Sequence, residues 1–136
     1  MKAKITWLNG RVFVGESGSG HSVIMDGAPE SGGRNTGFRP MEMMLLGLGG
    51  CTAFDVVMIL EKSREKVTGC EVSLEGERAS EDPKIFTAVK IVYRLKGEDL
   101  KPVAVERAIT LSEEKYCSAT KMFEKTATIT HEWHIV

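Results

Sequence analysis

The sequence predicts an α+β protein in which antiparallel strands surround one long buried helix. Alternating segments occupy the first 26 residues, a nearly continuous apolar segment covers residues 40–63, and alternating segments return after residue 68. Strands that flank a single apolar helix are typical of α+β folds, in which sheets cover the helix. Because 136 residues is the usual size of one domain, we expect residues 1–136 to form a single domain.

Three short strands are predicted at the beginning of the chain, over residues 4–9, 11–17 and 20–26. Asn9-Gly10 is a hairpin-turn signal between the first two, and Gly18-Ser19-Gly20 marks a second tight connection. The glycine-rich segment 27–39 follows, and we expect it to be a mobile loop. Loops of this length in a compact domain are usually functional or disordered.

The apolar segment 40–63 is predicted to be a helix. Pro40 suits the first helical turn, and Glu42 complements the positive end of the helix dipole. Apolar residues occur on nearly all sides of this helix, and a helix with that pattern is buried on most sides.

Three glycines in four residues interrupt this helix: Gly47, Gly49 and Gly50. Each costs about 1 kcal/mol relative to alanine in a helix interior, so the presence of three glycines here needs a structural reason. The close approach of another backbone is one reason, and the same helix of a second copy would supply it. This interpretation predicts a homodimer with the helix at its centre, and a local break in the helix is the alternative.

The second half of the chain is predicted to contain two long strands, two helices and a final strand, over residues 68–79, 85–96, 100–111, 117–127 and 128–136. A polar turn at residues 80–84 connects the two long strands. The first of these helices carries a stripe formed by Val103, Ala104, Arg107, Ala108 and Leu111.

Composition excludes several classes of protein. The net charge of −1 is not the basic footprint of a nucleic-acid-binding protein. No apolar run approaches the roughly eighteen residues of a membrane span, and the first residues do not resemble a signal peptide. Three widely spaced cysteines do not form a secreted disulfide framework. We therefore expect a cytoplasmic protein without nucleic-acid or membrane partners.

Two cysteines, Cys51 and Cys117, lie at or near the start of helix-like segments. A thiol reacts as the thiolate, whose formation is favoured by helix N-termini and nearby cations. Cys117 is better placed, because a thiol at a helix start faces unsatisfied backbone N–H groups. The two thiols suggest a peroxidatic and resolving pair. Two buried small residues are the alternative, because free cysteine is among the most buried residue types.

Activation of Cys51 requires a cation from elsewhere in the protein. Asp55 lies one turn later on the same helix face, where a carboxylate disfavours the thiolate, so we expect it to cap or pair with another group. The candidate cations are Arg11, Arg34, Arg39 or an arginine of a partner subunit.

No metal or cofactor is predicted. His131 and His134 are three residues apart in a strand pattern and point to opposite faces, and no Cys-x-x-Cys motif occurs. The glycine-rich segment 15–20 lacks the Gly-Lys-Thr/Ser ending of a phosphate-binding loop. Cys70 lies in the middle of a predicted strand, which favours a packing role.

A set of motifs runs in order through nearly the whole chain: Ser17-Gly18, Gly20-His21, Met25-Asp26-Gly27, Pro40-Met41-Glu42-Met43, Gly49-Gly50-Cys51-Thr52-Ala53, Asp55-Val56-Val57 and Glu114-Lys115-Tyr116-Cys117-Ser118. In these motifs the chain resembles the OsmC/Ohr family (osmotically inducible protein C and organic hydroperoxide resistance proteins), nearest to its small YhfA-like branch. The resemblance implies an OsmC-like fold and an intertwined homodimer in which sheets from both subunits wrap two central helices.

The resemblance also implies a reaction. In the family, the cysteine in the central helix attacks a peroxide oxygen and becomes a sulfenic acid. The second cysteine forms a disulfide with it, and an external dithiol, often lipoyl-based, restores the pair. By position, Cys51 takes the first role and Cys117 the second. This implies a thiol-dependent peroxidase of the oxidative stress response that reduces organic, apolar hydroperoxides.

One position departs from the family pattern. Hydroperoxide-reducing members usually carry glutamate directly after the proline, where this chain has Met41. Glu42 follows one residue later, which rotates its carboxylate by about 100° around the helix, and we give it a supporting catalytic role.

Two alternatives stay open. The first is a non-catalytic dimeric binder of a lipophilic or electrophilic small molecule, which Met41 favours. The second is a redox sensor that uses the same two cysteines.

Overall fold

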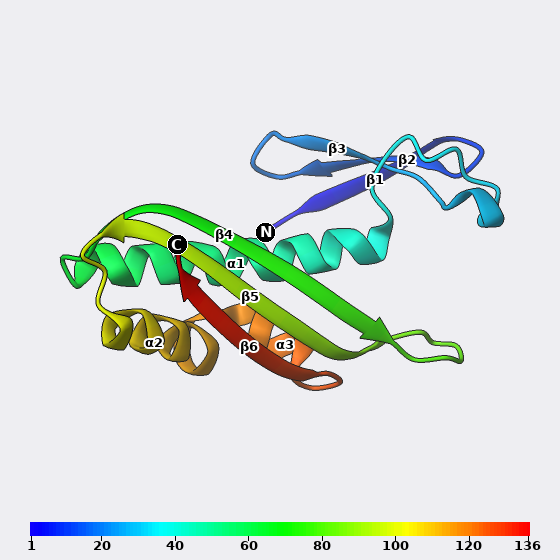
Figure 1. Ribbon diagram of the computed structural model, residues 1–136. Helices are drawn as coiled ribbons and strands as arrows, with labels where there is room; N and C mark the ends of the chain where they lie inside the picture. Colours follow the sequence, from blue (N-terminus) through cyan, green and yellow to red (C-terminus); the bar gives the residue numbers. More distant parts are fainter. The chain divides into compact units, whose positions relative to one another are not determined.

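The computed structural model describes all 136 residues, which divide into two compact units, Met1–Met44 and Leu45–Val136. The first unit contains β1 (Ala3–Asn9), β2 (Val12–Ser17), β3 (Ser22–Met25), the short 3₁₀ helix η1 (Pro29–Ser31) and the start of α1 (Pro40–Lys62). The second unit contains the rest of α1, β4 (Lys66–Arg78), β5 (Phe86–Glu98), α2 (Pro102–Leu111), η2 (Ser112–Tyr116), α3 (Ser118–Phe123) and β6 (Thr128–Ile135) (Figure 1). The predicted α+β class and the long helix are confirmed, and the single domain stays a prediction.

The first unit is built on an antiparallel sheet of three strands in the order β1-β2-β3. Both predicted turns are confirmed. Gly10 adopts a φ of +53° beside the pairing of Asn9 with Val12, and Gly20 adopts a φ of +91° between β2 and β3. These left-handed conformations favour glycine, because its missing Cβ removes the steric penalty.

The segment after β3, predicted as a mobile loop, is organised around Asp26, which is only 2% exposed. Its carboxylate accepts hydrogen bonds from the backbone N–H groups of Gly27, Arg34 and Thr36, and from the Thr36 hydroxyl at 2.7 Å. The loop therefore folds around a buried carboxylate whose oxygen atoms both accept hydrogen bonds.

This arrangement predicts an acid-sensitive loop. The Thr36 hydroxyl and the three N–H groups lower the pKa of Asp26 to about 2. The pKa of Asp26 in the folded protein lies below its unfolded value of about 4. The stabilisation of the folded loop by the Asp26 carboxylate is therefore complete above about pH 4 and is lost toward pH 2. We expect the Thr36 amide proton resonance to titrate with a midpoint near pH 2, measured by NMR. A midpoint near pH 4 would contradict the assignment, and Glu30→Gln in the same loop is the control.

The second unit consists of a three-stranded sheet, in the order β4-β5-β6, with the helices on one face (Figure 1). β4 and β5 pair in antiparallel register, from Lys66 opposite Glu98 to Arg78 opposite Phe86. β6 runs parallel to β5, so the expectation of antiparallel strands is wrong for this pair. The reason is the helical crossover of α2, η2 and α3, which carries the chain back before β6 begins.

The core of the second unit lies between the sheet and the helices. On β5, the buried side chains of Val89, Ile91, Tyr93 and Leu95 alternate with more exposed ones. α1 contributes the fully buried Leu48, Val56 and Leu60.

The burial of α1 differs from the prediction. Only one side of the helix is buried within the chain, and Phe54 remains 70% exposed. A Cβ at Gly49 would lie 2.5 Å from Leu74 Cδ1, so within the chain the close neighbour of this glycine is a side chain of β4, rather than another backbone. Gly47 and Gly50 have open space where a Cβ would be.

By length and composition alone, α1 is long and apolar enough to cross a membrane, contrary to the expectation that no segment is. Its middle, however, carries Thr52 and Asp55, which are buried and bound through hydrogen bonds to Ser112. We therefore describe α1 as the core helix of this fold.

The segment between β5 and β6 also differs in detail. α2 buries Val105, Ala108 and Ile109, whereas Val103 of the predicted stripe is 75% exposed. The π-helical turn η2 follows directly and was not predicted. α3 is shorter than the predicted helix over residues 117–127.

Candidate active site

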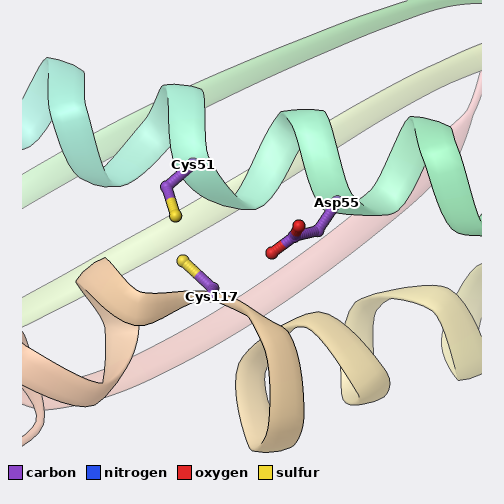
Figure 2. A group of neighbouring side chains, drawn as sticks. All are labelled: Cys51, Asp55 and Cys117. Carbon is purple, nitrogen blue, oxygen red and sulfur yellow. The ribbon is translucent and has the colours of Figure 1, made fainter.

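The structure brings the two predicted cysteines together. Cys51 lies on α1, and Cys117 is the extended residue between η2 and α3. Their sulfur atoms and a carboxylate oxygen of Asp55 all lie within 4.8 Å of one another. Figure 2 shows the two sulfurs facing each other across a gap, with the Asp55 carboxylate pointing toward the same gap. The sequence placed Asp55 on the face of Cys51, but not beside Cys117.

Cys117 is fully buried and caps the start of α3, where its sulfur accepts a hydrogen bond from the Thr120 N–H at 3.4 Å. The predicted contact with free N–H groups at a helix start is therefore confirmed. Burial nevertheless raises the pKa of this thiol, the Thr120 N–H opposes the shift, and the neighbouring Cys51 adds to it. The Cys117 thiol is thus held in its neutral form.

The π-helical turn η2 determines where Cys117 lies. The Cys117 N–H donates to the carbonyl of Ser112 at 2.7 Å, and the chain then becomes extended at Cys117. π-Helical turns often occur at functional sites, because the extra residue redirects side chains. Here the turn holds the Ser112 side chain in the interior, close to Asp55.

A buried chain of hydrogen bonds supports Asp55. The Tyr93 hydroxyl is 2.7 Å from Thr52 Oγ1, which is 3.0 Å from Ser112 Oγ, and Ser112 Oγ donates to Asp55 Oδ2 at 3.3 Å. Burial raises the pKa of Tyr93 far above its ordinary value, so its hydroxyl stays protonated. The expectation that Asp55 pairs with another group is confirmed, and its partner is Ser112.

The remaining candidate ligands lie outside this cluster. Cys70 is half-buried on β4, and burial raises its pKa. His131 contacts Glu113 at 2.9 Å, and His134 lies near Glu132. Two thiols and one carboxylate are one ligand short of the closed set of a structural zinc site, so we do not assign Cys51, Asp55 and Cys117 as a structural metal site.

Glu42 and the candidate arginines belong to the unit Met1–Met44. Glu42 accepts a hydrogen bond from the Arg39 backbone N–H at 2.9 Å, which stabilises the start of α1 as in a capping box. The arginine side chains are hydrogen-bonded within the same unit: Arg11 to Ser31, Arg34 to Asn9, and Arg39 to Asn35. A catalytic role for Glu42 and the identity of an activating arginine stay predictions.

Fold and site together define a small α+β protein in which a long helix presents one thiol to a second thiol at the start of a short helix. A family model described as OsmC-like protein matches residues 32–132. The chain belongs to the OsmC family, so the family predicted from the sequence motifs is confirmed.

Individual relatives agree with this assignment. Protein YhfA of Escherichia coli (strain K12) is 48% identical over 136 residues, which cover 100% of this chain and 98% of that protein. A hypothetical protein from Aquifex aeolicus VF5 has the same fold, with a TM-score of 0.87 and 28% identity over 99% of this chain and 95% of that one. An organic hydroperoxide resistance protein OsmC, a predicted redox protein from Legionella pneumophila, shares the fold at a TM-score of 0.73 and 14% identity, over 98% and 96% of the two chains.

Proposed function

We propose that this protein is a thiol-dependent peroxidase that reduces organic hydroperoxides, with Cys51 as the peroxidatic and Cys117 as the resolving residue. The observation that carries the proposal is the approach of these two sulfurs, one from α1 and one from the cap residue before α3, to within 4.8 Å. Membership of the OsmC family supports a redox role. The Legionella pneumophila relative, described as an organic hydroperoxide resistance protein, supports the substrate class.

The proposed reaction has three steps. The Cys51 thiolate attacks a peroxide oxygen, the O–O bond breaks, and an alcohol leaves while Cys51 becomes a sulfenic acid. Cys117 then forms a disulfide with Cys51, and water leaves. An external dithiol of the lipoyl class reduces the disulfide. The order of the two cysteines follows from access, because Cys51 is partly exposed whereas Cys117 is fully buried.

The same proposal includes apolar substrates and a cytoplasmic homodimer. Phe54 is highly exposed three residues after Cys51, and neighbours at this helical spacing share a face, so an apolar substrate would contact it. The open space at Gly47 and Gly50 is suited to the same helix of a second chain. A reducing compartment such as the cytoplasm keeps thiols ready for the reaction.

A second candidate function is supported by a different feature. The sheet of the first unit forms an apolar groove of about 330 Å³, lined by residues that include Ile5, Val23, Met25 and Met43. Such a groove suits a lipophilic small molecule. A non-catalytic binder of this kind would leave both thiols unchanged by peroxide, and a redox sensor would form the disulfide without turnover.

The test is mass spectrometry of the reduced protein before and after one equivalent of cumene hydroperoxide, with hydrogen peroxide in parallel. We expect each chain to lose two hydrogens, mapped to a Cys51–Cys117 disulfide and faster with the organic peroxide. Under native conditions, the spectrum is expected at the mass of two chains. No change over many minutes would contradict the peroxidase and favour the binder.

A further inference from the structure

One group beside both thiols has no part in the steps above. We propose that Asp55 is the proton-transfer residue of the disulfide-forming step, in which its carboxylate takes the Cys117 thiol proton and delivers it to the hydroxyl that leaves the Cys51 sulfenic acid as water. This inference rests on the proposed function and deepens it.

The need for such a group follows from the surroundings of Cys117. A thiol must lose its proton to attack the second sulfur, because the thiolate is the nucleophile. Cys117 is fully buried, so solvent does not reach its sulfur to remove the proton. The Thr120 N–H favours the thiolate but is a donor, so it cannot accept the proton.

The geometry supplies the acceptor. A carboxylate oxygen of Asp55 lies within 4.8 Å of both sulfurs, so one group neighbours both the atom that loses the proton and the atom that carries the leaving hydroxyl (Figure 2). The Ser112 hydroxyl bonds to Oδ2 and holds the carboxylate in this position. Ser112 is held in turn by Thr52.

The other titratable groups around the cluster are less suited to the role. Tyr93 on β5 keeps its proton, and its hydroxyl is engaged with Thr52. Glu113 on η2 contacts His131 at 2.9 Å. Cys70 on β4 is itself a thiol, whose pKa burial raises. Asp55 is the carboxylate that the fold places with the two thiols.

The step balances without a further reagent. The Cys117 S–H bond breaks and its proton moves to Asp55. The Cys117 sulfur then forms the S–S bond as the S–O bond of the Cys51 sulfenic acid breaks. The departing oxygen takes the proton from Asp55, water leaves, and the carboxylate is restored. The oxidising equivalent is the hydroperoxide that formed the sulfenic acid.

The test is Asp55→Asn, which keeps the shape of the side chain but removes the base. After one equivalent of cumene hydroperoxide, dimedone trapping measures the Cys51 sulfenic acid and intact mass measures the disulfide. We expect sulfenic acid formation at least as fast as in the unaltered protein, because the variant removes a carboxylate that disfavours the Cys51 thiolate. Disulfide formation is expected to be slower by about 10² or more, the usual range for general acid–base catalysis.

Glu61→Gln, at an exposed carboxylate of the same helix, is the matched control and is expected to leave both rates unchanged. An unchanged disulfide rate in folded Asp55→Asn would overturn the inference and leave the peroxidase intact. If the unaltered protein forms no sulfenic acid, the proposed function itself fails. If Asp55→Asn does not fold, Ser112→Ala replaces it: slower disulfide formation supports the inference, and an unchanged rate overturns it.

Discussion

Cys51→Ser is expected to abolish hydroperoxide turnover, whereas Cys117→Ser is expected to allow one oxidation per chain and then stop. A serine hydroxyl does not ionise near neutral pH and cannot replace the Cys51 thiolate as a nucleophile. Without Cys117, the sulfenic acid at Cys51 loses the sulfur that the structure places beside it. The measurement is the steady-state consumption of cumene hydroperoxide with a lipoyl-type dithiol, together with the intact mass of each variant.

Cys70→Ser is the matched control. Cys70 lies on β4, outside the cluster, so this variant is expected to retain full activity and to form the Cys51–Cys117 disulfide. A persistent gain of one oxygen at Cys51 should appear in Cys117→Ser alone. Full steady-state activity in either of the first two variants would refute the assigned roles.

The second large effect is expected on stability. Thr52→Val should lower the free energy of unfolding by about 2–3 kcal/mol, because valine has the shape of threonine but no hydroxyl. The fully buried Tyr93 hydroxyl would lose its 2.7 Å partner, and Ser112 would lose one of its two. An unsatisfied buried polar group costs about 1–3 kcal/mol. Urea unfolding at a fixed protein concentration measures the change.

A double variant separates the hydrogen bond from general packing. Adding Tyr93→Phe to Thr52→Val removes the orphaned hydroxyl, so part of the lost stability should return. Thr87→Val is the control, because its hydroxyl bonds to Glu77 at an exposed position and the change should stay within about 0.5 kcal/mol. Equal stabilities of Thr52→Val and the unaltered protein would mean that the buried hydrogen bonds of Thr52 contribute little to the free energy of unfolding.

Much of this fold follows from local patterns in the sequence. The apolar segment 40–63 corresponds to α1, and the glycines after Asn9 and Ser19 form the predicted tight turns. These features depend on a residue and its near neighbours, since periodicity and backbone freedom are local properties. The motifs around Cys51 and Cys117 also sufficed to identify the family.

Tertiary structure decided the features that depend on residues far apart in the chain. The direction of β6 depends on how the crossover returns to the sheet, and the close neighbour of Gly49 is Leu74 of another strand. No pattern along the sequence links Asp55 to Ser112 or brings it beside Cys117. The sequence by itself determined the long helix α1, the two tight turns, the family and the identity of the two thiols. Only the packing of α1 against η2 and α3 set the distance between those thiols. Residues that meet across a core come from segments far apart in the chain, and periodicity along the sequence does not show which segments meet.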